Sequence, residues 1–298
     1  MGILRLMKKI ADKSIGEAGE LPEAKYPVPD DLLEEFNIGY KGRDGNALTA
    51  DIYRQKDGGD QQEKRPVVII IHGGGLFAGR PVMERGAAEA FARKGYLVFV
   101  PSYRMLTEAD ACGEIADICS GFDFAGSRLE EYGGDPERIF VVAESAGAYL
   151  ALYASAMIRS KKLCDVIACE PPHINIRAIS FISGMFYVTR RDFIGLSYPR
   201  EIFKERSVDT EFMKYMDPEC SEVISALPPA ILTTSRNDFL RKYTISYAEA
   251  LAANGKEYKL VYYAEKNKAL IHAFPSIHPD LPESVDVHKK IDRWFREH

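Results

Sequence analysis

The chain has 298 residues, of which 46 % are hydrophobic and 28 % charged, a balance typical of a water-soluble globular protein rather than a disordered or fibrous one. The formal net charge of −5 supplies no basic surface for nucleic acid or for an anionic membrane. Length alone suggests two domains, although single α/β domains of this size are common. Composition therefore bounds the class of protein without indicating any chemistry.

The cysteines and the first residues bear on the cellular compartment. Five cysteines is an odd number, no Cys-x-x-Cys pair occurs and the spacings do not suggest a zinc site, so we expect reduced thiols and no bound metal. Residues 1–14 lack the uninterrupted apolar core of a signal peptide. The longest weakly polar stretch, 146–158, is too short to span a bilayer. We therefore predict a cytoplasmic protein without a membrane or nucleic-acid partner.

Short apolar runs separated by helical segments predict a buried parallel sheet. The runs at 67–71, 96–100 and 139–143 are rich in β-branched and aromatic residues and lack polar alternation, which is typical of strands covered by helices on both faces. The predicted strands cover residues 48–53, 67–71, 96–100, 139–143, 178–183, 230–234 and 258–263. The predicted helices cover residues 84–94, 114–132, 148–158, 243–254 and 283–297.

The stretch 184–221 interrupts this rhythm. It is rich in Phe, Tyr, Met and Arg and has no clear alternation of strands and helices. Either an insertion over a binding site or an ordinary irregular connection would have this composition. Because no linker divides the chain, we predict a single α/β domain over residues 1–298, with a doubly wound, mostly parallel sheet flanked by helices.

A serine lies at the turn between a predicted buried strand and a predicted helix. Residues 143–147 read Ala-Glu-Ser-Ala-Gly, which meets the pattern Gly-x-Ser-x-Gly except that Ala143 stands at its first position. Such a tight turn exposes the serine hydroxyl at the carboxyl edge of the sheet and needs small neighbours. Taken alone, the run is weakly specific, because small residues are common at the start of a helix after a strand, and Ser145 is also compatible with an ordinary helix N-cap.

Further motifs place a glycine loop, an acid and a base at the same edge. Residues 72–75 read His-Gly-Gly-Gly directly after a predicted strand, and consecutive glycines let backbone N–H groups converge on one point, as the oxyanion of acyl transfer requires. Asp238 and His272 each follow a later predicted strand. The order Ser145, Asp238, His272 is the one expected of a nucleophile, acid and base on an α/β scaffold.

With these motifs the chain resembles the hormone-sensitive-lipase-like esterases of the α/β-hydrolase superfamily, over residues 65–298. The shared motifs are His-Gly-Gly-Gly at 72–75, Tyr-Arg at 103–104, Gly-Gly-Asp-Pro-Glu-Arg-Ile at 133–139, Glu-Ser-Ala-Gly at 144–147, Asp238, and His-Ala-Phe at 272–274. The resemblance implies that Ser145 is the nucleophile and that the amides of Gly74, Gly75 and Ala146 form an oxyanion hole. It also implies an α/β-hydrolase fold with a small helical cap from residues 1–45 and 184–221, and no cofactor.

Residues and resemblance together predict a serine carboxylester hydrolase that cleaves short- to medium-chain acyl esters, acetyl esters among them, through a Ser-His-Asp triad and an acyl-enzyme. An amide-directed hydrolase, such as an arylformamidase or a small peptidase, would use the same triad and stays open. A non-catalytic binding protein on this fold is a more distant alternative, because such proteins typically lose a triad member.

The substrate pocket carries less information. The expected partner is a small-molecule ester, and the oligomeric state is left open, with a homodimer among the alternatives. Glu144, Phe186 and Tyr187 are candidate substrate-binding residues. The two aromatic residues are equally suited to packing within the cap.

Overall fold

Strands alternate with helices along the described chain, which the computed structural model gives as residues 27–56 and 63–298. The strands are β1 Leu32–Lys41, β2 Ala47–Gln55, β3 Arg65–Ile71, β4 Leu97–Pro101, β5 Gly134–Glu144, β6 Ile176–Ile182, β7 Ala230–Ser235 and β8 Tyr258–Tyr263. Over these residues they form one eight-stranded sheet in the order β1-β2-β4-β3-β5-β6-β7-β8. From β4 to β8 all pairings are parallel, and β1 and β2 are joined antiparallel at one edge. The predicted doubly wound, mostly parallel sheet is confirmed.

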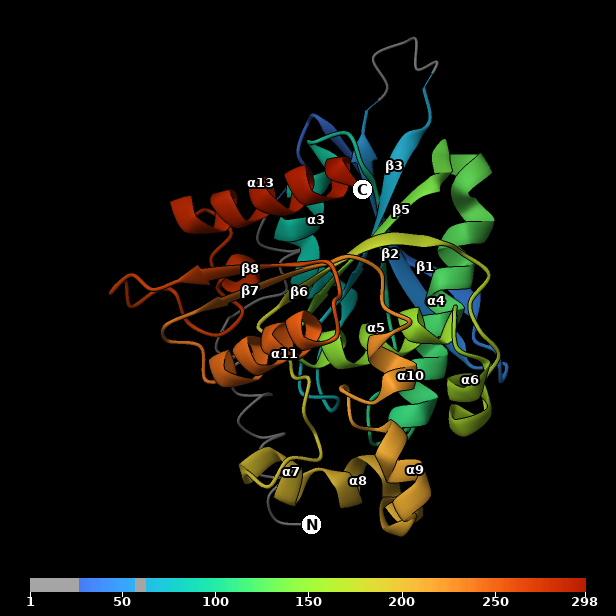
Figure 1. The fold of residues 1–298 in the computed structure, drawn as a ribbon. Helices are drawn as coiled ribbons and strands as arrows, with labels where there is room; N and C mark the ends of the chain where they lie inside the picture. The colour runs from blue at the N-terminus through green and yellow to red at the C-terminus, as the bar shows by residue number, and fades with distance from the viewer. Residues whose placement is uncertain (1–26, 57–62) are drawn as a thin grey trace.

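Helices cover both faces of the sheet (Figure 1). The longer helices are α3 Arg85–Ala92, α4 Ala111–Tyr132, α5 Ala146–Met157, α6 Lys161–Ile167, α11 Arg241–Ala253 and α13 Pro282–Glu297. The short ones are η1 Pro81–Glu84, α7 Phe193–Ser197, α8 Pro199–Phe203, η2 Lys204–Val208, α9 Thr210–Tyr215, α10 Ser221–Ile224 and α12 Phe274–Ile277. Helices α3 and α13 enclose one apolar core, and α4, α5 and α11 enclose the other. Because both faces are covered, every residue of β4 is buried.

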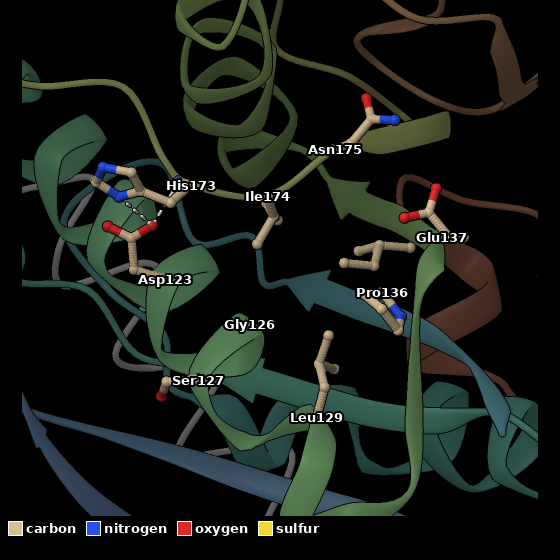
Figure 2. A pocket seen from close by; sticks show the side chains of 10 residues that line it. Asp123, Gly126, Ser127, Leu129, Pro136, Glu137, His173, Ile174 and Asn175 are labelled. Carbon is tan, nitrogen blue, oxygen red and sulfur yellow. Dashed lines mark hydrogen bonds and ion pairs between the residues drawn. The ribbon is translucent and has the colours of Figure 1, made fainter.

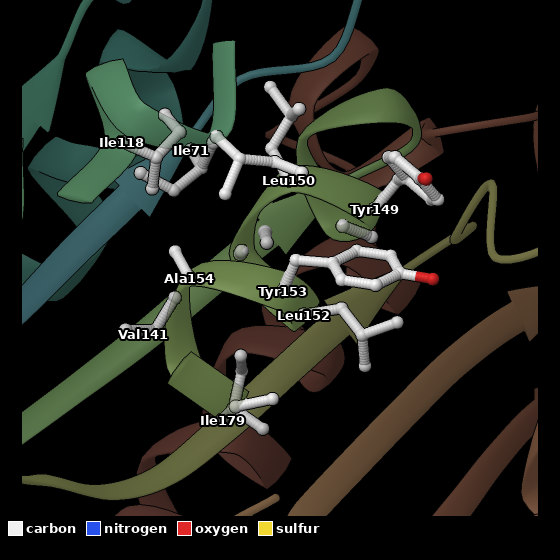
Figure 3. Close-up of a cluster of buried hydrophobic side chains, with 14 of the residues drawn as sticks. Ile71, Ile118, Val141, Tyr149, Leu150, Leu152, Tyr153, Ala154 and Ile179 are labelled. Atoms are coloured by element: carbon white, nitrogen blue, oxygen red, sulfur yellow. The ribbon is translucent and has the colours of Figure 1, made fainter. Parts of the chain in front are cut away.

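Helix α5 illustrates why one helix can be almost entirely apolar. All its residues are buried, and Figure 3 shows its side chains among those of β3, β5, β6 and α4. Its composition therefore reflects a position in the centre of the core. In the described parts of the chain, no helix combines the length and the apolar composition needed to cross a bilayer.

Helix α4 begins earlier than the predicted position at 114, because Asp110 caps its N-terminus. The Asp110 carboxylate accepts a hydrogen bond from the Gly113 N–H, so the helix begins at Ala111. Its end agrees with the prediction, since Gly133 adopts the left-handed conformation (φ 71°) in which helices commonly stop. The helix thereby leads directly into β5.

The predicted cap needs one correction. Residues 1–26 lie outside the described residues, but Leu32–Lys41 form β1, an edge strand paired with β2, instead of part of a cap. Their mixed polarity was misleading because an edge strand is only half buried, so its apolar positions alternate irregularly with exposed ones. The second predicted segment, 184–221, does contain the short helices α7, α8, η2 and α9, which lie together in Figure 1. Its role as a cap stays a prediction.

Candidate active site

Ser145 occupies a strained turn between β5 and α5. Its φ of 51° and ψ of −116° are unusual for a residue with a side chain, and neighbouring strands hold it there. The Ser145 N–H donates to the Ile182 carbonyl at 3.0 Å, and the Met185 N–H donates to the Ser145 carbonyl at 2.9 Å. A side chain at Gly147 would lie 2.4 Å from the His72 carbonyl oxygen, which explains the glycine two residues later. The turn is therefore fixed by backbone contacts on both sides.

Ala143, which replaces the usual first glycine of the motif, causes no visible strain. It lies inside regular strand β5 and is aligned with Ile71 of β3 and Phe181 of β6. Its methyl group is fully buried in the larger core. The strained backbone begins only at Ser145, so the alanine is compatible with the turn.

The structure brings the three predicted triad residues into one hydrogen-bonded chain. Ser145 Oγ lies 2.9 Å from His272 Nε2, and His272 Nδ1 lies 2.7 Å from Asp238 Oδ1. These residues follow β5, β8 and β7, so all three stand at the carboxyl ends of parallel strands. The serine can thus pass its proton to a ring whose other nitrogen faces a carboxylate.

Asp238 is kept ionised by its hydrogen bonds. Burial by itself would raise its pKa, but the bonds from the His272 ring, the Thr234 hydroxyl (2.7 Å) and the Leu240 N–H (2.9 Å) outweigh burial and lower the pKa below its usual value. Thr234 was not recognised from the sequence, because a threonine at the end of a strand has no distinctive pattern. It is nonetheless one of the three donors that orient the carboxylate.

Two serines fix the segment that carries His272. The Ser235 hydroxyl donates to the Leu270 carbonyl at 2.6 Å, and the Ser183 hydroxyl accepts the N–H of Ala273 at 3.0 Å. The exposed ring of Phe239 lies over the histidine, with 4.3 Å between ring centroids. The imidazole is therefore held from the backbone side and from the solvent side.

The glycine loop at 72–75 lies against the nucleophile. A Cβ on Gly73 would lie 3.0 Å from Ser145 Cβ, and Gly74 and Gly75 adopt φ angles of 125° and 67°. A Cβ on Gly74 would come within 1.7 Å of the Ala78 carbonyl oxygen, so only glycine fits there. Among the described residues, the backbone hydrogen bonds of this turn use the Gly74 carbonyl and leave the N–H groups of Gly74, Gly75 and Ala146 unpaired.

The buried His72 side chain is a neutral ring that contacts the backbone of the glycine loop. Burial lowers its pKa to about 4, and its Nδ1 lies 2.7 Å from the Gly73 carbonyl oxygen. The ring stacks on Tyr103 with 4.3 Å between centroids, and the Tyr103 hydroxyl donates to the His72 carbonyl at 3.0 Å. Together these contacts set the direction of the glycine backbone.

The three predicted substrate-binding residues have protein partners. The buried Glu144 carboxyl contacts the Ser276 hydroxyl, and the buried Phe186 ring stacks on Tyr247. The Tyr187 hydroxyl donates to a Glu219 carboxylate oxygen at 2.6 Å. A role of these residues in substrate binding therefore stays a prediction, and each already contributes to packing or to a polar contact.

A cavity of about 560 Å³ lies at the other edge of the sheet (Figure 2). Its wall includes Pro136 and Ile139 in the first half of β5, and Ile174 just before β6, whereas Ser145 follows the far end of β5. Asp123 and His173 meet there at 3.2 Å, but within residues 27–56 and 63–298 no cluster of three His, Cys, Asp or Glu residues could hold a metal ion. The hydrogen-bonded triad does not open into this cavity.

Comparison with known proteins identifies the family. A family described by the alpha/beta hydrolase fold matches residues 68–276, more than half of the chain. The chain belongs to the α/β-hydrolase family. The resemblance drawn from the motifs is thereby confirmed.

Several relatives of this α/β-hydrolase are named as esterases. It is 26 % identical over 246 residues to a probable isoprenylcysteine alpha-carbonyl methylesterase of Arabidopsis thaliana, covering 78 % of this chain and 49 % of the relative. It is 25 % identical to a carboxylesterase of Mycobacterium tuberculosis, covering 87 % and 81 %. The chain spans between 49 % and 60 % of the length of the four plant methylesterases that it matches.

Solved structures support the fold along the whole α/β-hydrolase chain. An inhibited esterase B from Lactobacillus rhamnosis superposes with a TM-score of 0.85 at 21 % identity, covering 100 % of this chain and 96 % of that one. An esterase from the archaeon Pyrobaculum calidifontis superposes with a TM-score of 0.70 at 21 % identity, covering 98 % and 93 %. The likeness extends beyond residues 68–276 to both ends of the described chain.

Proposed function

We propose that the protein is a serine carboxylester hydrolase that acts on short- to medium-chain acyl esters. The observation that carries this proposal is the hydrogen-bonded chain Ser145–His272–Asp238 beside a glycine loop with unpaired N–H groups. Relatives named as carboxylesterases and methylesterases support an ester substrate. A solved structure of esterase B inhibited by a tributyrin phosphonate supports a small-molecule substrate.

In the first half of the reaction, Ser145 Oγ attacks the ester carbonyl carbon while His272 Nε2 accepts the serine proton. The carbonyl oxygen becomes an oxyanion, which the N–H groups of Gly74, Gly75 and Ala146 stabilise. Asp238 holds the ring in the required tautomer and stabilises the imidazolium. As the tetrahedral intermediate collapses, the proton on His272 passes to the leaving alcohol, and an acyl-serine remains.

In the second half, water repeats the sequence of steps. His272 accepts a proton from water as the water oxygen attacks the acyl carbon, and it returns that proton to Ser145 Oγ as the carboxylic acid leaves. These steps need only groups of the protein and water, so we propose no cofactor.

The position of segment 184–221 supports the proposal that it forms a cap over this site. The Tyr198 hydroxyl would lie 3.3 Å from a Cβ on Gly75, so this segment reaches the glycine loop. We propose that it limits the size of the acyl group. A series of p-nitrophenyl esters from two to eight acyl carbons, with acetylated sugars and matched anilides, measures this limit. Turnover of anilides above that of esters would instead favour the amide-directed alternative.

Labelling with a fluorophosphonate probe tests the proposed nucleophile. We expect the wild type to be labelled at Ser145 and to hydrolyse p-nitrophenyl acetate, and Ser145→Ala to lose both the label and about a millionfold in kcat. Peptide mapping of the adduct identifies the labelled serine. An unlabelled wild type without ester turnover would favour a non-catalytic binding protein.

A further inference from the structure

A second group of polar side chains adjoins the triad and has no part in the proposed mechanism. It consists of Glu144 at the end of β5, Glu84 at the end of η1, and Ser276 in α12, four residues after His272. Both glutamates are buried, with 7 % and 2 % of their surface exposed. Ser276 Oγ lies 3.0 Å from Glu84 Oε2 and 2.5 Å from Glu144 Oε2.

Hydrogen-bond accounting determines what this geometry requires. A hydroxyl group has one proton, so Ser276 can donate to only one of the two carboxyl groups, and its other contact must use an oxygen lone pair as acceptor. If both glutamates were ionised, the second contact would place a carboxylate oxygen against the Ser276 hydroxyl oxygen with no proton between them. In a buried space such a contact costs considerable free energy. One carboxyl group must therefore keep its proton and donate it to Ser276. The trio therefore holds at least one acidic proton.

The surrounding groups favour the same state. Burial and the charge of Glu84 raise the pKa of Glu144 well above its usual value, and Asp238 adds to this effect against the opposing bond from Ser276. Burial also raises the pKa of Glu84. Burial, together with the charges of Glu114, Glu84 and Glu144, raises the pKa of the Tyr103 phenol well above its usual value.

We propose that Glu84, Ser276 and Glu144 form a proton-holding bridge, which keeps the nucleophile, the catalytic histidine and the glycine loop in fixed positions relative to one another. Glu144 precedes the nucleophile, Ser276 follows the catalytic histidine, and Glu84 follows the glycine loop along the chain. The Glu144 carboxyl also adjoins that loop, since a Cβ on Gly73 would lie 3.4 Å from its Oε1. When the shared proton is lost, two negatively charged carboxylates contact one hydroxyl group. Their repulsion separates the bridge residues, so the active-site segments are held less firmly.

The three bridge members are positioning residues, because none of them touches the reacting atoms. The expected effect of these residues on activity rests on the proposed esterase function. The sharing of a proton among them does not depend on that function. Two variants of Glu84 separate the proton from mere packing. Glu84→Gln supplies an amide N–H that donates to Ser276 at every pH, and Glu84→Ala removes the contact.

The first readout is the pH profile of kcat/KM for p-nitrophenyl acetate. At pH 7 we expect Glu84→Ala to lower kcat/KM by about tenfold to a hundredfold, and Glu84→Gln to restore most of this loss. We expect the alkaline fall in the wild-type kcat/KM to move up by about one pH unit or more in Glu84→Gln, because an amide has no proton to lose. Glu131→Gln, which removes an exposed carboxylate on α4, is the matched control and should not move the profile.

The second readout is the unfolding midpoint, which requires no catalysis. Since the folded-state pKa of the bridge carboxyl groups is raised, their stabilising effect is complete below the ordinary value of 4.5 and is lost as the pH rises through the raised value. We therefore expect the wild type to lose stability relative to Glu84→Gln as the pH rises from about 5 through the raised Glu84 pKa of about 7. Thermal melts of both proteins across this range measure the difference.

The outcomes separate the bridge from the esterase proposal. If Glu84→Gln keeps the wild-type alkaline limb and the wild-type pH dependence of unfolding, the proton-holding bridge is wrong although Ser145 still reacts with a fluorophosphonate. If the wild type is inactive and unlabelled, the esterase proposal fails, while the melts still decide the bridge. Should Glu84→Ala not fold, Ser276→Ala replaces it in the activity series, with the same expected loss.

Discussion

Two histidine–aspartate pairs occur in the described residues, at opposite edges of the sheet. At the carboxyl edge, His272 lies 2.7 Å from Asp238, whose side chain is fully buried while the ring is 18 % exposed. Near the amino edge, His173 lies 3.2 Å from Asp123, and the exposed fractions are 81 % for the histidine and 28 % for the aspartate. The residue types are the same, so the difference between the pairs lies in their surroundings.

Those surroundings decide which pair can act as a base. His272 has a nucleophile on its second nitrogen and a carboxylate that is shielded from water, so the attraction between acid and ring is strong. Asp123 also binds the guanidinium of Arg43 at 2.6 Å, which competes for its charge, and the exposed ring of His173 is surrounded by solvent. A histidine–aspartate pair is therefore informative only together with burial and a third partner.

The largest expected effect comes from removing each histidine in turn. His272→Ala should lower kcat for an ester by about a millionfold, because the ring that accepts the serine proton is removed. His173→Ala is its matched control and should leave kcat unchanged. Steady-state kinetics on p-nitrophenyl acetate measure both. A large loss in the control variant would mean that the amino-edge pair contributes to the reaction.

The second comparison exchanges each aspartate for asparagine. Asp238→Asn should reduce kcat by about ten thousandfold, since the amide favours the wrong tautomer of the ring. Asp123→Asn should change kcat little, although it weakens the contact with Arg43. The measurement is kcat, with circular dichroism to confirm folding. Equal losses in the two variants would remove the distinction between the pairs.

The third comparison concerns glycines with positive φ angles. Gly74→Ala should lower kcat by about a hundredfold to a thousandfold, because its Cβ would meet the Ala78 carbonyl and displace the N–H donors of the loop. Gly255 also has a positive φ, but nothing lies within 4 Å of an added Cβ, so Gly255→Ala controls for backbone strain alone. Only the first variant should lose activity; a comparable loss in Gly255→Ala would assign the effect to strain.

The smallest expected effect is on stability and its pH dependence. Thr234→Val removes one donor to Asp238 and should cost about 1 kcal/mol of unfolding free energy near pH 7. Because the folded-state pKa of Asp238 is lowered, its contribution is present above the ordinary pKa of aspartate and is lost as the pH falls through the lowered value. Urea unfolding at several pH values should therefore show the difference shrinking below about pH 4. A difference that grows on acidification would contradict this assignment.

Sequence patterns were most informative where a residue's neighbours along the chain determine its environment. Runs such as the one in β4 are apolar because both faces of the strand are covered, and that pattern is readable without a structure. The edge strand β1 escaped prediction, since partial exposure leaves no regular pattern. Phe186 and Tyr187 were candidates for the pocket, yet their partners Tyr247 and Glu219 come from distant parts of the chain.

Short stretches of the chain were enough to predict the class of protein, the buried parallel sheet and the roles of Ser145, Asp238 and His272. Local motifs suffice for these, because a strand followed by a tight turn places its next residue at the carboxyl edge whatever the rest of the chain does. The three-dimensional contacts were needed to establish which histidine–aspartate pair is buried beside a serine, and that Ser276 lies within hydrogen-bond distance of both Glu84 and Glu144. Burial and side-chain contacts depend on segments that are far apart in sequence, so neighbouring residues along the chain do not predict them.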